Sequence, residues 1–315
     1  MSIKRLQQGC IFLLLSLAAM QASASAYTVF YSPVYWRASE QTASIWATQV
    51  SSNAYTRERF GPANIGFDYS PGFKLGAQHT FDNNEWQSQL YWTSYGTKTN
   101  TNYRLNFQLL IPEFFSGFLS KNYFFGANSN WDLNMNTLDL QISRAISLTD
   151  KLTLKAMLGI KGAVIDQTVN TVWDAILYQS TEHVTHDYFG VGPSFGVAAA
   201  YQFADHWRVV GDAAASFLWG RWDVKDVYHR PAVPLVTTET TITTSLSDDQ
   251  LGTWMLDDFI GLAWEHPGKV STALQFGYEA QFWADQLRMT TFQQLPNRGD
   301  LTLQGATCGL YFTFS

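Results

Sequence analysis

The fold is decided by one stretch, GVGPSFGVAAAYQFADHWRVVGDAAASFLWGRW, which runs from Gly190 to Trp222. From Phe189 to Phe203 the odd positions carry apolar side chains, and the even positions are small or polar. After Ala204-Asp205-His206 the alternation resumes and continues from Trp207 to Trp219. A period of two places alternate side chains on opposite faces of a strand. The stretch therefore predicts a hairpin whose strands are longer than the five or six residues usual in soluble proteins.

The same hairpin design recurs three more times along the chain. In each, a short polar turn joins two alternating segments. The three pairs of segments are 65–81 with 86–95, 138–148 with 152–160, and 260–264 with 270–278. Segments 28–38 and 301–314 add a first and a last strand, which brings the total to about ten. We expect longer loops at 96–130, 166–186, 223–252 and 284–300. Short turns alternating with long loops predict an all-β fold, a transmembrane up-and-down antiparallel β-barrel with short periplasmic turns and long extracellular loops.

A lipid environment explains this pattern better than water does. In lipid every backbone polar group must be paired, and a closed sheet has no open edge. The aromatic residues Trp86, Trp207, Trp219 and Trp264 occur near strand ends, as in the girdles of membrane barrels. A soluble β-sandwich is the alternative, but the strand length and the amino-terminal segment both argue against it.

That amino-terminal segment has the order of a secretory signal. Lys4 and Arg5 precede an apolar run, Ile11–Met20, which is too short to span a bilayer as a helix. Small residues follow, and we expect cleavage between Ala26 and Tyr27, with cleavage after Ala24 as the alternative. The sequence therefore predicts a signal peptide at 1–26, an outer-membrane β-barrel domain at 27–315 and localisation in the bacterial outer membrane.

The composition narrows the class of protein further. Charged residues make up 15% of the chain, whereas about a quarter is usual in soluble proteins. Loss of Lys4 and Arg5 would leave 18 basic and 26 acidic residues, a net charge of −8, which argues against a nucleic-acid partner. It would also remove Cys10 and leave Cys308 as the remaining thiol, so no intramolecular disulfide is expected.

The polar phase of the strands should face the barrel lumen. The residues expected there are Asp68, Lys74, Gln87, Gln89, Asp139, Lys155, Lys161, Arg208, Asp212, Gln275 and Glu279. Ten strands enclose a narrow interior. Charges of both signs would pair across the interior and narrow it, whereas the small inward residues from Gly192 to Ala200 would leave room for a passage. We expect a porin-like protein that passes small hydrophilic solutes or ions, with a weak preference for cations.

Several long motifs resemble the Legionella major outer-membrane protein family. They occur in matching order: WDLNMNTLDL (131–140), LGIKGAVIDQ (158–167), YFGVGPSFGVAAAY (188–201), AAASFLWGRWDV (213–224), FGYEAQFW (276–283) and GDLTLQGATCGLYFTF (299–314). The resemblance implies an outer-membrane β-barrel that is porin-like and associated with surface exposure and host contact. The aromatic segment 111–125 and the terminal Ser315 depart from the family. No catalytic motif of the family is available to transfer.

A second hypothesis places the function in the extracellular loops of a closed barrel. Its candidates for adhesion or host contact are the Thr-rich TTETTITT within 223–252 and the aromatic segment 111–125. Simpler explanations are that the Thr run extends strands above the membrane and that the aromatic run rests at the interface or plugs the lumen. The tripeptide Arg298-Gly299-Asp300 is best explained by chance, because a strand should start there.

An enzyme is the third class. Asp257 and Asp258 on one side, and His183, His186 and Asp187 on the other, could activate water at the outer rim. Their spacing is unspecific, and the two His residues lack a third placed metal ligand. We therefore expect no catalytic activity, no metal and no cofactor. The expected partners are outer-membrane lipid, lipopolysaccharide and the barrel-assembly machinery, with host or cell-surface ligands on the loops and no nucleic acid.

Overall fold

The structure is a computed structural model that describes residues 26–41, 46–51, 59–62, 66–81, 85–104, 108–112, 124–248, 252–290 and 296–314. The predicted signal peptide lies outside the described residues, except for Ala26, at which the first strand begins. None of the described residues forms a helix long and apolar enough to cross a membrane.

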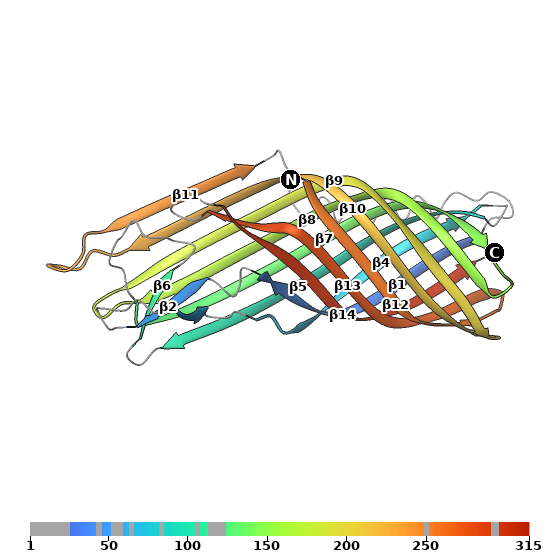
Figure 1. The fold of residues 1–315 in the computed structure, drawn as a ribbon, viewed down its shortest axis with the longest axis horizontal. Helices are drawn as coiled ribbons and strands as arrows, with labels where there is room; N and C mark the ends of the chain where they lie inside the picture. The colour runs from blue at the N-terminus through green and yellow to red at the C-terminus, as the bar shows by residue number, and fades with distance from the viewer. Residues whose placement is uncertain are drawn as a thin grey trace.

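Ten of the described strands form the wall of a closed barrel. They are β1 (Ala26–Glu40), β4 (Tyr69–Thr80), β5 (Trp86–Arg104), β7 (Gly126–Ser147), β8 (Leu152–Asp174), β9 (Gln179–Ala204), β10 (Trp207–Arg230), β12 (Gly252–His266), β13 (Val270–Thr290) and β14 (Pro296–Phe314). Each pairs antiparallel with the wall strands before and after it, and β1 pairs with β14, which closes the sheet (Figure 1). The predicted ten-stranded barrel is confirmed.

Four shorter strands accompany the wall. β11 (Thr240–Asp248) pairs along the far end of β10. β2 (Ala47–Ser51), β3 (Arg59–Pro62) and β6 (Gln108–Pro112) form a small sheet in the order β3-β2-β6. β2, β6 and β11 all lie at the same end of the barrel, opposite the short turns (Figure 1). β6 and β11, which fall in two of the segments predicted to be long loops, therefore lie at this end together with β2, from the connection between β1 and β4.

A lipid-facing band surrounds the half of the barrel nearest the short turns. On β9 the outward side chains from Phe189 to Phe203 are apolar and about half exposed. On β10 the band runs from Trp207 to Trp219, about 40 Å of strand, or roughly 30 Å along the membrane normal at a tilt of ~40°. Trp207 pairs with Trp264 at the short-turn boundary. The distance between the aromatic boundaries matches the hydrocarbon thickness of a bilayer.

Beyond this band the strands continue, where the sequence pattern led us to expect loops. β8 ends at Asp174 and β9 begins at Gln179, so only the turn Ala175–Tyr178 separates them. β10 likewise continues to Arg230. We call this part of the wall the extension; it includes residues 126–136 of β7, 166–174 of β8, 179–188 of β9 and 220–230 of β10. Most of the described residues in the four expected loops belong to strands.

The polarity of the alternation inverts between the band and the extension. Along β7 the outward residues of the extension are polar, namely Asn128, Asn130, Asp132, Asn134 and Asn136, whereas inward Trp131, Leu133 and Met135 are fully buried. Within the band Leu138, Leu140 and Ile142 face outward, and Asp139 and Gln141 face inward. Water surrounds the extension, so the hydrophobic effect places apolar side chains inside it. In lipid the apolar side chains face outward instead.

Candidate functional site in the barrel lumen

A polar cavity of about 240 Å³ occupies the lumen within the band. Side chains from all ten wall strands line it. Its charged groups are three carboxylates and two ammonium groups, contributed by Asp212, Asp257, Glu279, Lys74 and Lys155. Glutamines, tyrosines, small residues and the apolar side chains of Phe30, Met157 and Phe259 complete the lining. The cavity therefore carries a formal excess of one negative charge.

The charges in the cavity are partly neutralised by one another. The ammonium group of Lys74 forms an ion pair with the carboxylate of Glu279. Glu279 also accepts hydrogen bonds from Thr307 at 3.0 Å and from Gln281 at 3.1 Å. Lys155 donates to the amide oxygen of Gln87 at 2.9 Å. The cavity is consequently a hydrogen-bonded polar region.

A buried ion pair lies inside the same band. The ammonium nitrogen of Lys161 is 2.7 Å from the Oδ1 atom of Asp139, and the two residues are direct partners across β7 and β8. Thr137 donates a hydrogen bond to the other carboxylate oxygen at 3.3 Å. Both charged side chains are almost completely buried. Removing one member of a buried ion pair leaves an uncompensated buried charge. Substitution of either Asp139 or Lys161 alone should therefore destabilise the fold strongly.

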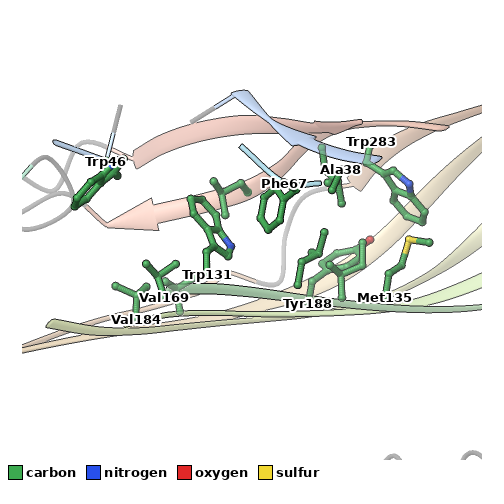
Figure 2. Packing of buried hydrophobic residues seen from close by; sticks show 14 of the residues in the cluster. Ala38, Trp46, Phe67, Trp131, Met135, Val169, Val184, Tyr188 and Trp283 are labelled. Atoms are coloured by element: carbon green, nitrogen blue, oxygen red, sulfur yellow. The ribbon is translucent and has the colours of Figure 1, made fainter. Parts of the chain in front are cut away.

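The lumen of the extension is filled by an apolar core. Fully buried indoles reach it from five wall strands: Trp36 from β1, Trp131 from β7, Trp173 from β8, Trp222 from β10 and Trp283 from β13. Figure 2 shows Trp283 and Ala38 on one side of the interior facing Met135 and Tyr188 on the other. The core therefore crosses the whole lumen.

Residues from the connecting segments complete this core. Trp46 stacks near Trp173 with 5.2 Å between ring centroids, and Phe124 lies 5.4 Å from the same ring. Phe67 packs edge-on against Trp131, as Figure 2 shows. Phe124 is buried and belongs to the aromatic segment 111–125, of which residues 113–123 lie outside the described residues. At Phe124 the segment lies against the core.

Buried ionisable groups lie within the extension. Glu182 and Asp226 face inward from β9 and β10, and Trp173 donates a 2.8 Å hydrogen bond to Glu182. Burial raises the pKa of Asp226 to about 7. Burial, followed by the nearby Asp226, raises the pKa of Glu182 well above its usual value. Burial lowers the pKa of His186 to about 4, and its Nε2 atom accepts a 3.2 Å hydrogen bond from the Arg288 backbone. Burial therefore disfavours the charged form of each of these three groups.

The structure brings most of the sequence-predicted lumen residues together. Seven of them line the cavity: Lys74, Gln87, Gln89, Lys155, Asp212, Gln275 and Glu279. Asp139 and Lys161 form the buried ion pair. Arg208 pairs with Glu265 at 2.8 Å near the short turns and is partly exposed. Asp68 lies just before β4 and is exposed.

Of the small inward residues of β9, Ala198 lines the cavity, whereas Gly192, Ser194 and Gly196 lie close against β10. A Cβ atom on Gly192 would lie 1.8 Å from the carbonyl oxygen of Phe217, and one on Gly196 would lie 2.6 Å from that of Ala213. Ser194 accepts a 3.0 Å hydrogen bond from Ser216 of β10. These residues allow β9 and β10 to approach closely.

The candidate catalytic residues are spread over separate surfaces. Asp257 lines the cavity, whereas Asp258 faces outward on β12. On β9, His183 is exposed and contacts Asn170, and His186 is buried. β10 lies between β9 and β12. Among the described residues, no group of three or more His, Cys, Asp or Glu side chains could hold a metal ion.

Two of the motifs in the expected loops have structural roles. The last five residues of TTETTITT, Thr240–Thr244, belong to β11, which extends the sheet above the band, as the simpler explanation predicts. Arg298-Gly299-Asp300 belongs to the start of β14. There Asp300 accepts a 2.9 Å hydrogen bond from the backbone of Asp285. The tripeptide is thus held in a strand.

The apolar core and its polar partners were missed from the sequence. The signal that could have revealed them is the change of phase within WDLNMNTLDL, where apolar side chains move from odd to even positions. Trp131 also donates a 2.8 Å hydrogen bond to Gln167, which in turn donates to Glu40 at 2.8 Å. That network joins residues far apart in the chain, and no local pattern predicts it.

Several solved outer-membrane proteins are similar to this chain in fold. The outer membrane protease OmpT of Escherichia coli superposes with a TM-score of 0.48 at 10% identity, covering 94% of this chain and 99% of OmpT. A major outer membrane protein from Thermus thermophilus gives 0.40 at 11% identity, covering 92% and 100%. Ail, the attachment invasion locus protein of Yersinia pestis, gives 0.25 at 11%, covering 92% and 99%. No curated protein matches the sequence.

The family assignment comes from the sequence itself. Residues 21–314 match the family described as Legionella pneumophila major outer membrane protein precursor. The match spans all ten wall strands and both ends of the closing seam. Together with the lipid-facing band, it places the protein in the outer membrane, with the short turns on the periplasmic side and the extension outside the cell. The chain belongs to the Legionella major outer membrane protein family.

Proposed function

We propose that this outer-membrane barrel is a surface-exposed protein with a closed lumen, whose function lies in its extracellular extension. The observation that supports this proposal is the apolar core that crosses the lumen of the extension. Trp131, Trp222 and Trp283 enter it from different sides and are fully buried. An ion following the lumen would have to displace these side chains and lose its hydration among them, which is energetically costly. Adhesion or host contact by the extension follows as the proposed role.

Planar-bilayer recording of the purified, processed protein tests this proposal. We expect no conductance steps from the wild type. A triple variant, Trp131→Ala, Trp222→Ala and Trp283→Ala, should conduct, because it removes large side chains from three sides of the core. The triple variant also controls for insertion of the barrel into the bilayer. Wild-type steps as large as those of the triple variant would contradict a closed lumen.

Attachment to host cells tests the extracellular role. Removing residues 231–239 shortens the β10–β11 tip, where Leu235 and Val236 are exposed. Bacteria that carry this deletion should attach less than the wild type while holding equal amounts of barrel in the outer membrane. Unchanged attachment would argue against adhesion through this tip.

Porin-like passage of small cations is the second candidate. The polar cavity favours it, because three carboxylates against two ammonium groups would attract cations. If wild-type protein conducts, Asp212→Asn with Asp257→Asn should lower the cation preference, measured as the reversal potential in a potassium chloride gradient. An unchanged reversal potential would show that the carboxylates of this cavity do not set the cation preference.

We propose that lipid covers the band, that lipopolysaccharide meets its outer boundary and that the barrel-assembly machinery inserts the protein. We assign no catalytic role to Asp257, Asp258, His183, His186 or Asp187 and no cofactor to the chain.

A further inference from the structure

The strand that pairs with one edge of β10 changes where β10 leaves the band. From Trp207 to Trp219, β10 pairs with β12. From Trp222 to Arg230, the same edge of β10 pairs with β11 instead. β12 begins only at Gly252, so above that level β11 and the far end of β13 both have an edge without a strand partner in the described part of the chain.

The open edge of β13 is capped by side chains. Asp285 has a φ of 51°, and a shift of register there turns the strand end inward. The backbone oxygen of Gln286 accepts a 2.9 Å hydrogen bond from the Trp222 indole, and the backbone of Arg288 donates to His186. All of these residues except Asp285 are buried. This edge is therefore protected from pairing with another chain.

The open edge of β11 comes close to β13 at a few residues but is not hydrogen-bonded to it, and among the described residues no side chain caps it in the same way. The strand reads TTITTSLSD and contains no Lys, Arg or Pro, the residues that usually protect edges. Ile242 and Leu246 pack against the apolar core, and Thr241, Thr243 and Ser245 are exposed. Threonine and isoleucine favour strands. β11 therefore presents a straight row of backbone groups beside an apolar inner face and a polar outer face.

We propose that the free edge of β11 binds an extended polypeptide segment of an extracellular partner, which adds a strand to the wall. Main-chain hydrogen bonds would supply affinity, and alternate side chains would supply specificity. The partner strand should place apolar side chains beside Ile242 and Leu246 and polar ones beside Thr243 and Ser245. This proposal deepens the surface role and rests on it.

A second copy in the same membrane does not fit this edge. Neighbouring copies in one membrane are related by rotation about the membrane normal. Such a rotation keeps the rise of every strand along the normal, so two β11 strands cannot meet antiparallel. At a strand tilt of ~40° they would instead cross at roughly 80°. A segment from outside the membrane has no such restriction.

Hydrogen–deuterium exchange of the whole protein in detergent provides the first test. In β11, amides bonded to β10 should exchange slowly, and alternate amides on the free edge should exchange rapidly. Amides of β9 in the extension, which pair on both sides, should all be slow. Uniformly slow exchange in β11 would mean that its edge is already covered and would overturn the proposal.

A synthetic peptide provides the second test. The probe carries the sequence of residues 240–247 with one lysine added at each end for solubility. We expect saturable binding and at least tenfold slower exchange of the free-edge amides. Thr243→Lys should weaken binding at least tenfold, because a charged side chain would stand at the edge. Thr181→Lys, an exposed position between two paired strands, is the matched control and should bind as the wild type does.

Three results would overturn the assignment. Failure of millimolar peptide to slow the free-edge amides would remove the proposed partner strand. Equal weakening of peptide binding by Thr243→Lys and Thr181→Lys would mean that the added charge, and not its place on the edge of β11, causes the loss. A stable dimer that Thr243→Lys dissociates would assign the edge to a second copy. None of these results bears on bilayer conductance, so the closed-lumen proposal is tested separately.

Discussion

Charge placed on neighbouring residues of β9 should reveal the facing of the barrel wall. Val197 lies near the centre of the lipid-facing segment Phe189–Phe203, and its side chain is 48% exposed. Ala198, the next residue, lines the polar cavity. Val197→Arg therefore places a guanidinium in hydrocarbon, whereas Ala198→Arg places it in the lumen.

The structure sets the size of each effect. Arginine at the bilayer midplane of a barrel costs about 2 to 4 kcal/mol, which corresponds to a change of about 30-fold to nearly 1,000-fold in the folding equilibrium. Ala198 is the direct partner of Asp212 on β10 and of Lys155 on β8, so an arginine there meets one opposite and one like charge in a polar lumen instead of hydrocarbon. We expect Ala198→Arg to cost at most about 1 kcal/mol. Thr181→Arg faces water in the extension and should change stability by less than about 0.5 kcal/mol.

Reversible unfolding in urea, with the barrel folded into phosphatidylcholine vesicles, measures all three variants. The expected order of destabilisation is Val197→Arg far above Ala198→Arg, with Thr181→Arg nearest the wild type. Equal losses at 197 and 198 would refute the assigned facing. A loss at Thr181 as large as that at Val197 would refute the boundary between band and extension.

Three further predictions address the interior. Lys161→Met should destabilise the barrel by about 3 to 5 kcal/mol in the same assay, because Asp139 remains buried without its partner, and the added Asp139→Leu should recover most of the loss. Burial raises the pKa of Asp226 from 3.8 to about 7, so the folded state keeps a proton that the unfolded chain releases between these values. Stability should therefore fall as the pH rises through this window, and Asp226→Asn should remove that part of the fall; an unchanged slope between pH 4.5 and 7.5 would count against it. Gly192→Ala should destabilise the barrel by more than about 1 kcal/mol, because its Cβ atom would meet the carbonyl of Phe217, and a wild-type midpoint in urea would disprove the close strand approach.

The part of the fold that lies in lipid could be predicted from the sequence. From Phe189 to Phe203 the environment is uniform on each side of the wall, so alternation reports the facing directly. The same holds for seven of the cavity residues, including Lys74 and Glu279, because within the band the polar phase of each strand points to one lumen.

The extension could not be predicted in the same way. There water replaces lipid outside, and side chains such as Trp131 and Trp222 replace polar groups inside. If apolar side chains are expected to face outward along the whole strand, the polar outward residues of the extension are wrongly assigned to loops. The packing of Phe124 and Trp46 onto Trp173 depends on contacts between segments more than 40 residues apart, which hydrophobic periodicity does not encode.

The seam between β1 and β14 has a consequence for biogenesis. Its register joins Tyr27 to Phe314 and Glu40 to Leu301, so the earliest strand to leave the ribosome is zipped to the latest. Until the last strand is added, the growing sheet exposes two unpaired strand edges, and a chain truncated before residue 301 lacks the residues of β14 that pair with β1. Rejoining the native ends and opening the polypeptide at the Thr149-Asp150-Lys151 turn would shift that vulnerability to a different pair of strands without altering the finished cylinder.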